Sequence, residues 1–256
     1  AWEYADYAPD FTGGVGWKSA SAGRLDLTGR PWAETAYTQV AFDLVPVRMG
    51  VVRPDKAFEK HSPSAWRMSN ALESWSWDGC EGKKTVAEVY ATGYKVRLIL
   101  NGKTVGEKKV PANACVRFKV AYEPGELTAI SLAKDGKELG RTSLVTAGKE
   151  TKLTLVPERS EIVRGDLCYI RLQYTDEAGE IKPLARGTVK VEAEGGEILG
   201  LGSACPYNEA GYLGTQTDTY YGEALAIVRP TAEQVTVRAE SPYGTAQSVI
   251  VCREGE

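Results

Sequence analysis

From residue 75 onward the chain is a succession of short strand-like runs, which are separated by turn residues and have no helical pattern between them. Short strands at this spacing are typical of antiparallel sandwiches rather than of a parallel sheet. An immunoglobulin-like domain takes about 100 residues and about seven strands, so this region has room for two, divided near residues 147–148. The predicted strand runs are 85–91, 95–101, 115–122, 127–145, 151–156, 167–181, 188–202, 223–230, 234–240 and 247–253.

The run 96–110, VRLILNGKTVGEKKV, is a clear hairpin signal. Its first valine and the two leucines that follow alternate along one face of a strand. Tight hairpin turns need positive φ at both central residues, and Asn followed by Gly tolerates this best. We therefore predict a hairpin that turns at Asn101-Gly102. Asp135-Gly136 is a second signal of the same kind.

One segment, 31–44 (PWAETAYTQVAFDL), has the pattern of a helix. Trp32, Ala36 and Val40 are spaced four residues apart and form an apolar stripe. Proline opens the segment, where its missing N–H costs nothing, and a second proline follows closely, where a helix commonly stops. The neighbouring apolar residues expected beside this stripe are Tyr37, Ala41 and Leu44.

The region before the sandwiches has a different texture. Residues 9–30 are rich in Gly, Ser and Thr and are expected to form a loop, and the stretch 45–74 contains three prolines and no sustained period. A structureless connection this long is unusual inside a compact domain, so we interpret it as a boundary between two architectures. The sequence thus predicts a mainly β protein divided into 1–66, 67–147 and 148–256.

The composition argues against several classes of partner. A net charge of −3 gives no electrostatic reason to expect nucleic acid, which needs a basic surface. No apolar run approaches the roughly 20 residues that span a bilayer, and the opening AWEYADYAPD has neither the basic nor the apolar region of a signal peptide. The five cysteines lie far apart without a C-x-x-C pair, so we expect no zinc site, no redox motif and no cofactor.

Residues with catalytic potential lack the motifs that would activate them. His61 is the single histidine, and no G-x-S-x-G or H-E-x-x-H motif accompanies it, so we expect it at the surface. The glycines of 195–205 match no phosphate-binding pattern and are expected at strand ends and turns. No catalytic residue and no metal ligand is therefore assigned. Two acidic pairs alternate outward and are expected to be solvated, namely Asp176-Glu177 and Glu192-Glu194.

Aromatic side chains are the remaining hint of a ligand, because their faces can stack on sugar rings. All six tryptophans lie in the first third of the chain, and the spacing of Trp75 and Trp77 predicts that they share one face of a strand and pack. The segment 206–221, PYNEAGYLGTQTDTYY, is predicted to be a long loop at one end of a sandwich. Its rings either contact a glycan or pack the loop against its own sandwich. They are Tyr207, Tyr212, Tyr220 and Tyr221.

The segment 74–106 resembles a pattern in family 2 glycoside hydrolases of the β-galactosidase type. These enzymes carry W-x-W-x-G-x-E-G just after the catalytic barrel, followed by V-x-V-Y and by the hairpin E-V-E-L-F-L-N-G-K-S-L-G. Ser74 stands where histidine is usual, and Lys95 where an acidic residue is usual. The matching residues are Trp75, Trp77, Gly79, Glu81, Gly82, Val89, Tyr90 and the run 96–106.

The resemblance extends in both directions. The region 187–229, with GEILGLGSACP and YYGEALAIVRP, is similar to the extra C-terminal immunoglobulin-like domain of the family. Upstream, residues 1–7 and 21–43 resemble the end of the family's (β/α)8 barrel, which comprises the eighth strand, its loop and the last helix. Trp32 stands where the family commonly has lysine. The residues that match the family's G-x-L-D-x-x-G-x-P pattern are Gly23, Leu25, Asp26, Gly29 and Pro31.

The resemblance implies a function for the parent enzyme and a limit for this chain. Catalytic groups of such barrels lie at the C-terminal ends of different strands. The family's acid/base and nucleophile glutamates come from strands four and seven, upstream of Ala1, so none is assigned here. The implied reaction in the parent is retaining hydrolysis through a covalent glycosyl-enzyme. For Trp2, at the end of the presumed eighth strand, the resemblance implies a substrate-binding role, and it also implies a periplasmic or extracellular location.

Three functional hypotheses follow. In the first, the chain is an accessory C-terminal region of a β-galactosidase-like enzyme, without activity by itself; its partners are the missing catalytic barrel and, in the parent, a carbohydrate substrate. In the second it is a carbohydrate-binding module. In the third it is a structural spacer, but the apolar stripe of helix 31–44 argues against this. Without the barrel, this stripe would favour either self-association or docking of the helix onto the sandwiches.

Overall fold

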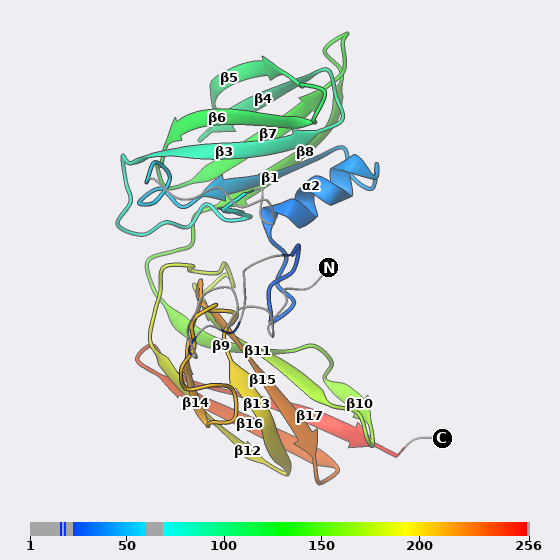
Figure 1. Cartoon of the computed structure of the whole chain (residues 1–256), viewed down its shortest axis with the longest axis vertical. Helices are drawn as coiled ribbons and strands as arrows, with labels where there is room; N and C mark the ends of the chain where they lie inside the picture. Colours follow the sequence, from blue (N-terminus) through cyan, green and yellow to red (C-terminus); the bar gives the residue numbers. More distant parts are fainter. Residues whose placement is uncertain (1–15, 17, 19–22, 60–68, 255–256) are drawn as a thin grey trace. The chain divides into compact units, whose positions relative to one another are not determined.

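The computed structural model of the chain describes residues 16, 18, 23–59 and 69–254 (Figure 1). These residues form two compact units that divide between Thr146 and Ala147, and Gly16 and Lys18 belong to the second unit. Trp2 and His61 lie outside the described residues. The prediction of a mainly β chain with two immunoglobulin-like sandwiches in tandem is confirmed.

The first unit is a sandwich of two antiparallel sheets with four strands each. The strand orders are β2-β1-β3-β6 and β5-β4-β7-β8, and both sheets contribute to a core that contains Val89 and Leu98. The strands are β1 (Val47–Val52), β2 (Ala71–Leu72), β3 (Lys84–Ala91), β4 (Lys95–Leu100), β5 (Lys103–Lys109), β6 (Cys115–Ala121), β7 (Glu126–Leu132) and β8 (Glu138–Val145).

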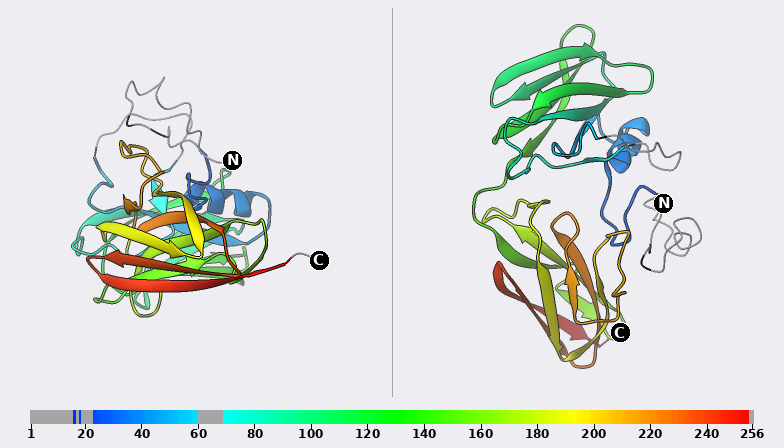
Figure 2. Two further views of the ribbon diagram at one scale, coloured as in Figure 1. Left: turned by 90° about the horizontal axis from the view of Figure 1, so that it is seen from below. Right: turned by 60° about the vertical axis from the view of Figure 1, so that its left-hand side comes forward.

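Helix α2 (Ala33–Ala41) packs on the sheet of this unit that contains β1 and β3 (Figure 2). The predicted stripe is confirmed, because Trp32, Ala36 and Val40 are all buried. The helix is shorter than the predicted span 31–44, and Leu44 at its far end is 71% exposed. The apolar face of the helix therefore covers the sheet only between Ala33 and Ala41 and does not extend to Leu44.

The second unit is also a sandwich, with sheets in the order β10-β17-β16-β12-β14 and β13-β15-β11-β9. Strand β10 runs parallel to β17, and the other strand pairs of this unit are antiparallel. One core of buried aliphatic and aromatic residues lies between the sheets, with Ile170, Tyr174 and Val237 fully buried. The strands are β9 (Lys152–Pro157), β10 (Glu161–Val163), β11 (Cys168–Thr175), β12 (Thr188–Glu194), β13 (Gly196–Gly202), β14 (Gln216–Asp218), β15 (Glu223–Pro230), β16 (Gln234–Ser241) and β17 (Gly244–Arg253).

The two predicted hairpins are present, with different turns. Asn101 and Gly102 have φ of 49° and 76°, so the first is the two-residue turn with positive φ at both positions. In the second hairpin, of β7 and β8, Gly136 has a φ of 88°, and the backbone N–H of Ala133 bonds to the carbonyl of Lys137 at 2.8 Å. The second hairpin predicted at Asp135-Gly136 is therefore confirmed, and its loop is longer than that of the first.

The expectation that 45–74 is irregular is wrong for β1 and for the short strand β2, which pairs with it. Strand β1 also pairs with β3, although it lies in the range 1–66 that the sequence assigned to the barrel remnant and linker. Its sequence VRMGVV lacks alternation because it is buried on both faces, by the sandwich core on one side and by α2 on the other. A Cβ atom on Gly50 would lie 2.9 Å from the Cβ of Ala33, so the helix approaches closely here because residue 50 has no side chain.

No helix within the described residues is long and apolar enough to cross a membrane.

Candidate functional site

The tryptophans of the W-x-W segment lie in the core of the first sandwich. Trp75 and Trp77 are fully buried, and the Trp75 indole N–H donates a hydrogen bond of 3.0 Å to the carbonyl of Glu123. The Trp75 ring meets that of Tyr122 edge to face, with centroids 5.0 Å apart. The prediction that the tryptophans pack is confirmed, although they lie in an irregular segment and not in a strand. Buried in this way, they offer no stacking surface to a ligand.

The glycines and the glutamate of the same segment shape a turn. Gly79 and Gly82 have φ of 74° and 75°, a conformation that favours glycine. The backbone N–H of Gly79 donates to the Glu81 carboxylate at 3.4 Å, and that of Gly82 donates to the carbonyl of Tyr122 at 2.9 Å. The segment is therefore a turn that is hydrogen-bonded to Tyr122, and its glycines and glutamate stabilise the fold.

Asp26 organises the turn that leads into α2. Its Oδ1 atom accepts hydrogen bonds from the backbone N–H groups of Thr28 and Arg30, both at 2.9 Å, and from the Thr28 hydroxyl at 2.8 Å. Asp26 is buried, and this burial raises its pKa although the three hydrogen bonds lower it in part. Gly29, with a φ of 79°, allows the chain to turn back. The G-x-L-D-x-x-G-x-P pattern thus encodes a closed turn.

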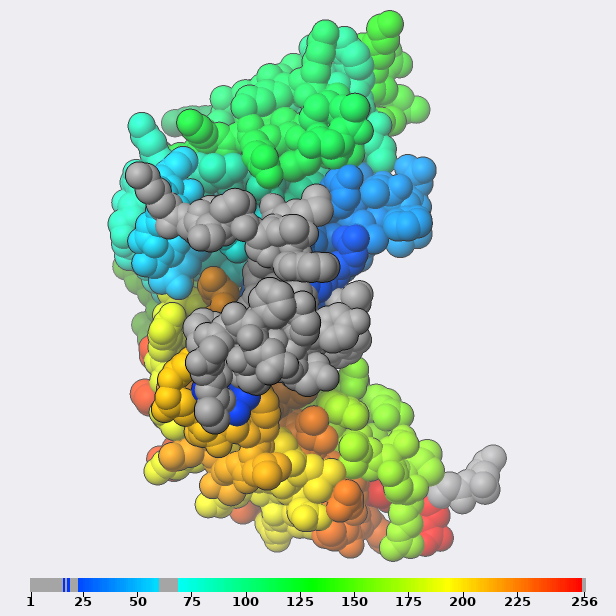
Figure 3. Space-filling view, in the orientation of Figure 1, coloured from blue at the N-terminus to red at the C-terminus, as the bar shows by residue number. Residues whose placement is uncertain are grey.

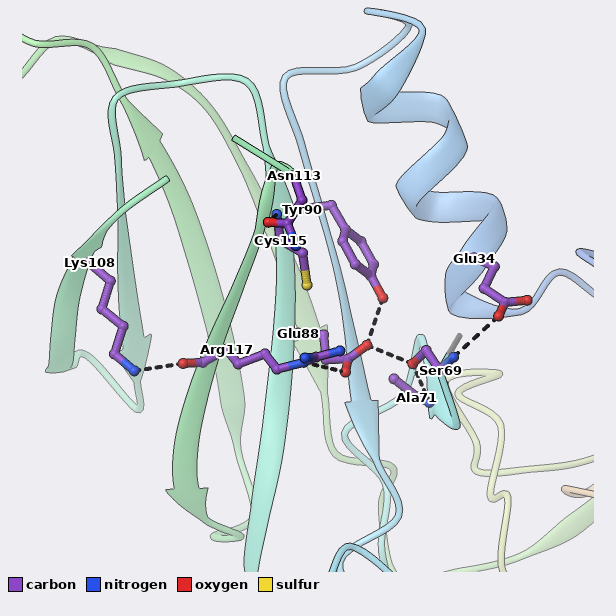
Figure 4. A network of polar contacts seen from close by, with 9 residues as sticks. All are labelled: Glu34, Ser69, Ala71, Glu88, Tyr90, Lys108, Asn113, Cys115 and Arg117. Atoms are coloured by element: carbon purple, nitrogen blue, oxygen red, sulfur yellow. Dashed lines mark hydrogen bonds and ion pairs between the residues drawn. The ribbon is translucent and has the colours of Figure 1, made fainter. Parts of the chain in front are cut away.

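Glu88 is the centre of a polar network between β3, β6, α2 and Ser69 (Figure 4). Its carboxylate accepts hydrogen bonds from the Ser69 hydroxyl at 2.6 Å and from the Tyr90 hydroxyl at 2.9 Å. On the other side, Arg117 Nε donates to Glu88 at 2.9 Å. Glu34 of α2 joins the network, since its Oε1 atom accepts the backbone N–H of Ser69 at 3.2 Å.

The network holds charge where solvent is scarce. Glu88 is 5% exposed. The burial of Tyr90, and next to it the negative charge of Glu88, raise the pKa of the Tyr90 hydroxyl well above its ordinary value. Burial first, and the Glu88 charge second, also raise the pKa of the Cys115 thiol. Tyr90 and Cys115 are therefore neutral donors or packing groups at physiological pH, and neither is an activated nucleophile.

The cavity beside this network is small. Its volume is about 80 Å³, and Glu34, Tyr37, Glu88 and Arg117 are among its lining residues. A water molecule in the liquid takes about 30 Å³ and ligand sites take roughly 300–1,000 Å³, so this space suits waters and not a sugar ring. The Glu88 network therefore fixes α2 and Ser69 on the sheet.

Asp176 overturns one sequence expectation. It is buried, and its carboxylate accepts the backbone N–H groups of Gly148 at 2.7 Å and Glu180 at 2.8 Å. A polar residue in a turn becomes buried when it supplies the acceptors that the backbone needs. The expectation of a solvated pair is thus wrong for Asp176. It is confirmed for Glu177, Glu192 and Glu194, which are exposed.

Most of the glycine-rich segment 195–205 is strand β13, and Gly200 lies within this strand, next to the register shift in its pairing with β15. Gly195, with a φ of 76°, joins β12 to β13, as expected for a turn glycine. Gly202 at the end of β13 lies under the ring of Tyr212, where a Cβ atom would come within 2.3 Å of the ring. The backbone N–H of Leu201 bonds to the carbonyl of Tyr212 at 2.7 Å. Tyr212 therefore packs its loop against the sandwich.

The other three tyrosines of the loop are at least partly accessible. Tyr207 is 47% exposed and its hydroxyl donates a hydrogen bond to Glu209. Tyr220 and Tyr221 are half-buried and meet edge to face with centroids 4.6 Å apart. Packing of the loop is thus confirmed for Tyr212, whereas Tyr207 is partly accessible and its contact with a glycan stays a prediction.

A cavity of about 490 Å³ lies between this loop and the ends of β12 and β14. The structure brings Tyr207 and Tyr220 together in it, whereas Tyr212 and Tyr221 are not among its lining residues. We call it the loop pocket, and its lining includes Arg186, Thr188, Tyr207, Asn208, Asp218 and Tyr220.

The polar residues of the loop pocket were not expected from the sequence. Thr188 and Asp218 are paired across β12 and β14, and the Thr188 hydroxyl bonds to Asp218 at 2.6 Å. Thirty residues of chain separate the two, so only the register of these strands reveals their proximity. The pairing of Thr188 with Asp218 could have been predicted only if residues 216–218 had been recognised as a strand. These three residues are all polar and show no apolar alternation, so the sequence does not indicate a strand there.

No group of three or more His, Cys, Asp or Glu side chains that could hold a metal ion occurs in the part of the chain that the structure describes. The five cysteines are free thiols.

Sequence and structural comparisons relate the chain to known proteins. Residues 153–250 match the family described as glycoside hydrolase family 2 C-terminal domain 5, and residues 82–140 match a domain of unknown function. β-Galactosidase BoGH2A of Bacteroides ovatus is 28% identical over 169 residues, which are 63% of this chain and 19% of that protein.

Two solved structures of family 2 glycosyl hydrolases from Bacteroides cellulosilyticus are similar over nearly the whole chain. The first, at 29% identity, has a TM-score of 0.83 and covers 93% of this chain and 32% of its own. The second, at 28% identity, has a TM-score of 0.80 and covers 98% and 37%. The chain thus spans about a third of the length of these relatives. By these matches, residues 153–250 belong to the C-terminal domains of family 2 glycoside hydrolases, and the chain as a whole is similar in sequence and fold to the C-terminal part of these enzymes.

Proposed function

We propose that this chain is the accessory C-terminal region of a β-galactosidase-like retaining glycoside hydrolase and that it does not hydrolyse glycosides by itself. One observation carries the proposal: buried carboxylates of both sandwiches are bonded to donors of their own fold. Glu88 accepts three hydrogen bonds, and Asp176 accepts two from the backbone.

Retaining hydrolysis needs a different arrangement. Two carboxyl groups must stand about 5–5.5 Å apart in a cleft, one as nucleophile and the other as acid and base. A carboxylate that is saturated by donors inside a fold is a poor nucleophile, because attack would break those bonds in a site closed to the sugar. The roughly 80 Å³ cavity beside Glu88 supports this view. In this proposal the two glutamates of the reaction come from the catalytic barrel.

The accessory role follows from the way in which α2 is held. The Asp26 turn leads into α2, and the Glu88 network fixes α2 to the first sandwich. In this proposal α2 is the last helix of the barrel, so the sandwich holds the end of the barrel in place. A periplasmic or extracellular location is part of the same proposal.

The test is an assay of this chain on aryl β-galactosides, β-glucosides and β-glucuronides, with release of the aryl group as the readout. We expect turnover no faster than in buffer. Turnover above that background would contradict the proposal. Its loss in Glu88→Gln or Asp176→Asn, with circular dichroism showing the variant folded, would further contradict the structural role given to that carboxylate.

A further inference from the structure

We propose that the loop pocket of the second sandwich binds a neutral carbohydrate, and that in the parent enzyme this is part of the substrate glycan. The second half of the statement rests on the proposed function. The first half concerns this chain alone.

The lining of the loop pocket combines the two kinds of group that recognise sugars. Tyr207 is 47% exposed and part of its ring lies against Gly16, so the accessible part of the ring is the apolar surface on which the C–H groups of a pyranose can pack. Around it are an amide at Asn208, a hydroxyl at Thr188 and a carboxylate at Asp218, which can bond to sugar hydroxyls. The volume of about 490 Å³ lies within the roughly 300–1,000 Å³ of ligand sites.

The charge of the lining selects among sugars. Arg186 is the one cationic residue among the described lining residues, and Glu209 and Asp218 are anionic. The lining therefore carries one more negative than positive charge, which disfavours uronic acids and sulfated sugars. A neutral hexose or pentose chain meets no such repulsion.

The loop is held in shape before any ligand arrives. Tyr212 anchors one side on Gly202, and the Asn208 side-chain amide donates to the carbonyl of Gly211 at 2.9 Å. A preorganised loop loses less conformational freedom on binding, so more of the contact energy appears as affinity.

Two backbone hydrogen bonds join this loop to the N-terminal part of the chain. The N–H of Lys18 donates to the carbonyl of Pro206, and the N–H of Asn208 donates to the carbonyl of Gly16, both at 2.6 Å. Figure 3 shows dark-blue atoms of this part of the chain against the orange surface of the loop. Residues 16 and 18 lie between the stretches 1–7 and 21–43, which resemble the end of the barrel, in the part of the chain that the sequence predicts to be a loop. Loops that follow the strands of a barrel surround its active site. These two hydrogen bonds are the observation from which we infer that the sugar in the loop pocket is part of the substrate of the parent enzyme.

The first experiment titrates this chain with methyl β-galactoside, lactose, xylotetraose, cellotetraose and glucuronic acid, using calorimetry and saturation-transfer NMR. We expect weak binding of at least one neutral sugar and weaker binding of glucuronic acid. Tyr207→Ala should weaken binding about three- to tenfold, which is the size of one aromatic contact. Tyr207→Phe should keep most of the affinity because the ring remains.

A matched control is Tyr169→Ala. Tyr169 is 38% exposed in the same sandwich and does not line the loop pocket, so its loss should leave binding unchanged. The proposal is overturned if none of the neutral sugars binds, if glucuronic acid binds most tightly, or if Tyr207→Ala and Tyr169→Ala bind alike.

The second experiment tests the connection with the N-terminal residues. A Cβ atom on Gly16 would lie 2.6 Å from the Tyr207 ring, so Gly16→Ala must move that ring. We expect it to weaken sugar binding as Tyr207→Ala does. In Gly214→Ala, where the nearest atom is 3.8 Å from the new Cβ, binding should not change. Unchanged binding in Gly16→Ala would refute the connection.

These results are separable from those of the hydrolysis assay. Turnover by this chain would refute the proposed function without touching the sugar titrations. Failure of the titrations would refute the loop pocket as a sugar site and leave the accessory role standing.

Discussion

The carboxylate of Asp176 and the backbone N–H of Gly148 form a hydrogen bond of 2.7 Å at the start of the second sandwich. Lys182, which is also buried, donates to the carbonyl of the same glycine at 3.0 Å and to that of Lys149 at 2.8 Å. Two buried side chains of opposite charge thus hold the backbone where β9 begins. This arrangement ties the edge of the sandwich to the turn after β11.

Asp176→Asn should destabilise the second sandwich in a pH-dependent way. Burial alone raises the pKa of Asp176, but the backbone hydrogen bonds from Gly148 and Glu180 outweigh it, so the pKa lies below the ordinary 3.8. The stabilisation by the charge is therefore present above pH 3.8 and is lost as pH falls through the lower folded pKa. We expect a loss of about 1–2 kcal/mol in the free energy of unfolding at neutral pH.

Urea unfolding of Asp176→Asn and the unsubstituted chain between pH 7 and pH 3 measures this difference. Glu177→Gln, at an exposed neighbouring position, is the control and should change stability little. A gap between Asp176→Asn and the original chain that stays constant across this range would show that the charge contributes nothing.

Tyr122→Phe should destabilise the first sandwich by about 1–3 kcal/mol. The substitution keeps the edge-to-face contact with Trp75 but removes the hydroxyl that accepts the backbone N–H of Trp77 at 3.1 Å, which leaves a buried backbone donor without this acceptor. Trp75 and Trp77 report the transition through their fluorescence. Tyr94→Phe, at a ring that is 38% exposed, should have little effect. Equal unfolding midpoints for the two variants would contradict the structural role of the hydrogen bond between the Tyr122 hydroxyl and the Trp77 backbone.

Glu88→Gln should also destabilise the first sandwich, by about 2 kcal/mol. The amide would present a donor to a site where Ser69, Tyr90 and Arg117 all donate. Glu107→Gln is the matched control, because Glu107 pairs with Arg97 at the surface at 2.6 Å and such pairs contribute at most about 1 kcal/mol. Urea unfolding measures the loss in the free energy of unfolding for each of the two variants. If Glu107→Gln costs as much as Glu88→Gln, the network does not hold the helix.

The sequence predicted the sandwiches because their strands alternate and turn on glycine. Where one face of a strand is solvated, as in β6, alternation marks it clearly. Where both faces are covered, the period disappears. This is why β1, which lies between the core and α2, was interpreted as a connection.

The polar sites were harder to predict than the fold, because burial of a charged side chain depends on partners distant in the sequence. Glu88 meets Arg117 through the pairing of β3 with β6, and Thr188 meets Asp218 through that of β12 with β14. A local pattern cannot contain such a pairing. A glutamate in the otherwise apolar TVAEVYA run was the available signal for the Glu88 network.

Gly125→Ala should be more harmful than Gly102→Ala, although both glycines have positive φ. At Gly125, with a φ of 132°, a Cβ atom would come within 1.9 Å of the Asn101 side chain, whose Oδ1 accepts the Glu126 N–H at 2.9 Å. At Gly102 the space is open, so only the backbone strain of about 1 kcal/mol applies. We expect more than about 2 kcal/mol for Gly125→Ala from urea unfolding. Equal losses would mean that Asn101 does not support the start of β7.

The end of α2 should make this chain self-associate. Phe42 and Leu44 follow the last residue of α2 and are 74% and 71% exposed. Large exposed apolar side chains favour association because it removes them from water. We expect the molar mass from light scattering to rise with protein concentration and to fall towards that of a monomer in the double variant Phe42→Ser, Leu44→Ser. Leu213→Ser, at a leucine that is 91% exposed in the second unit, is the control and should leave the association unchanged. A constant monomer mass for the unsubstituted chain would refute the prediction.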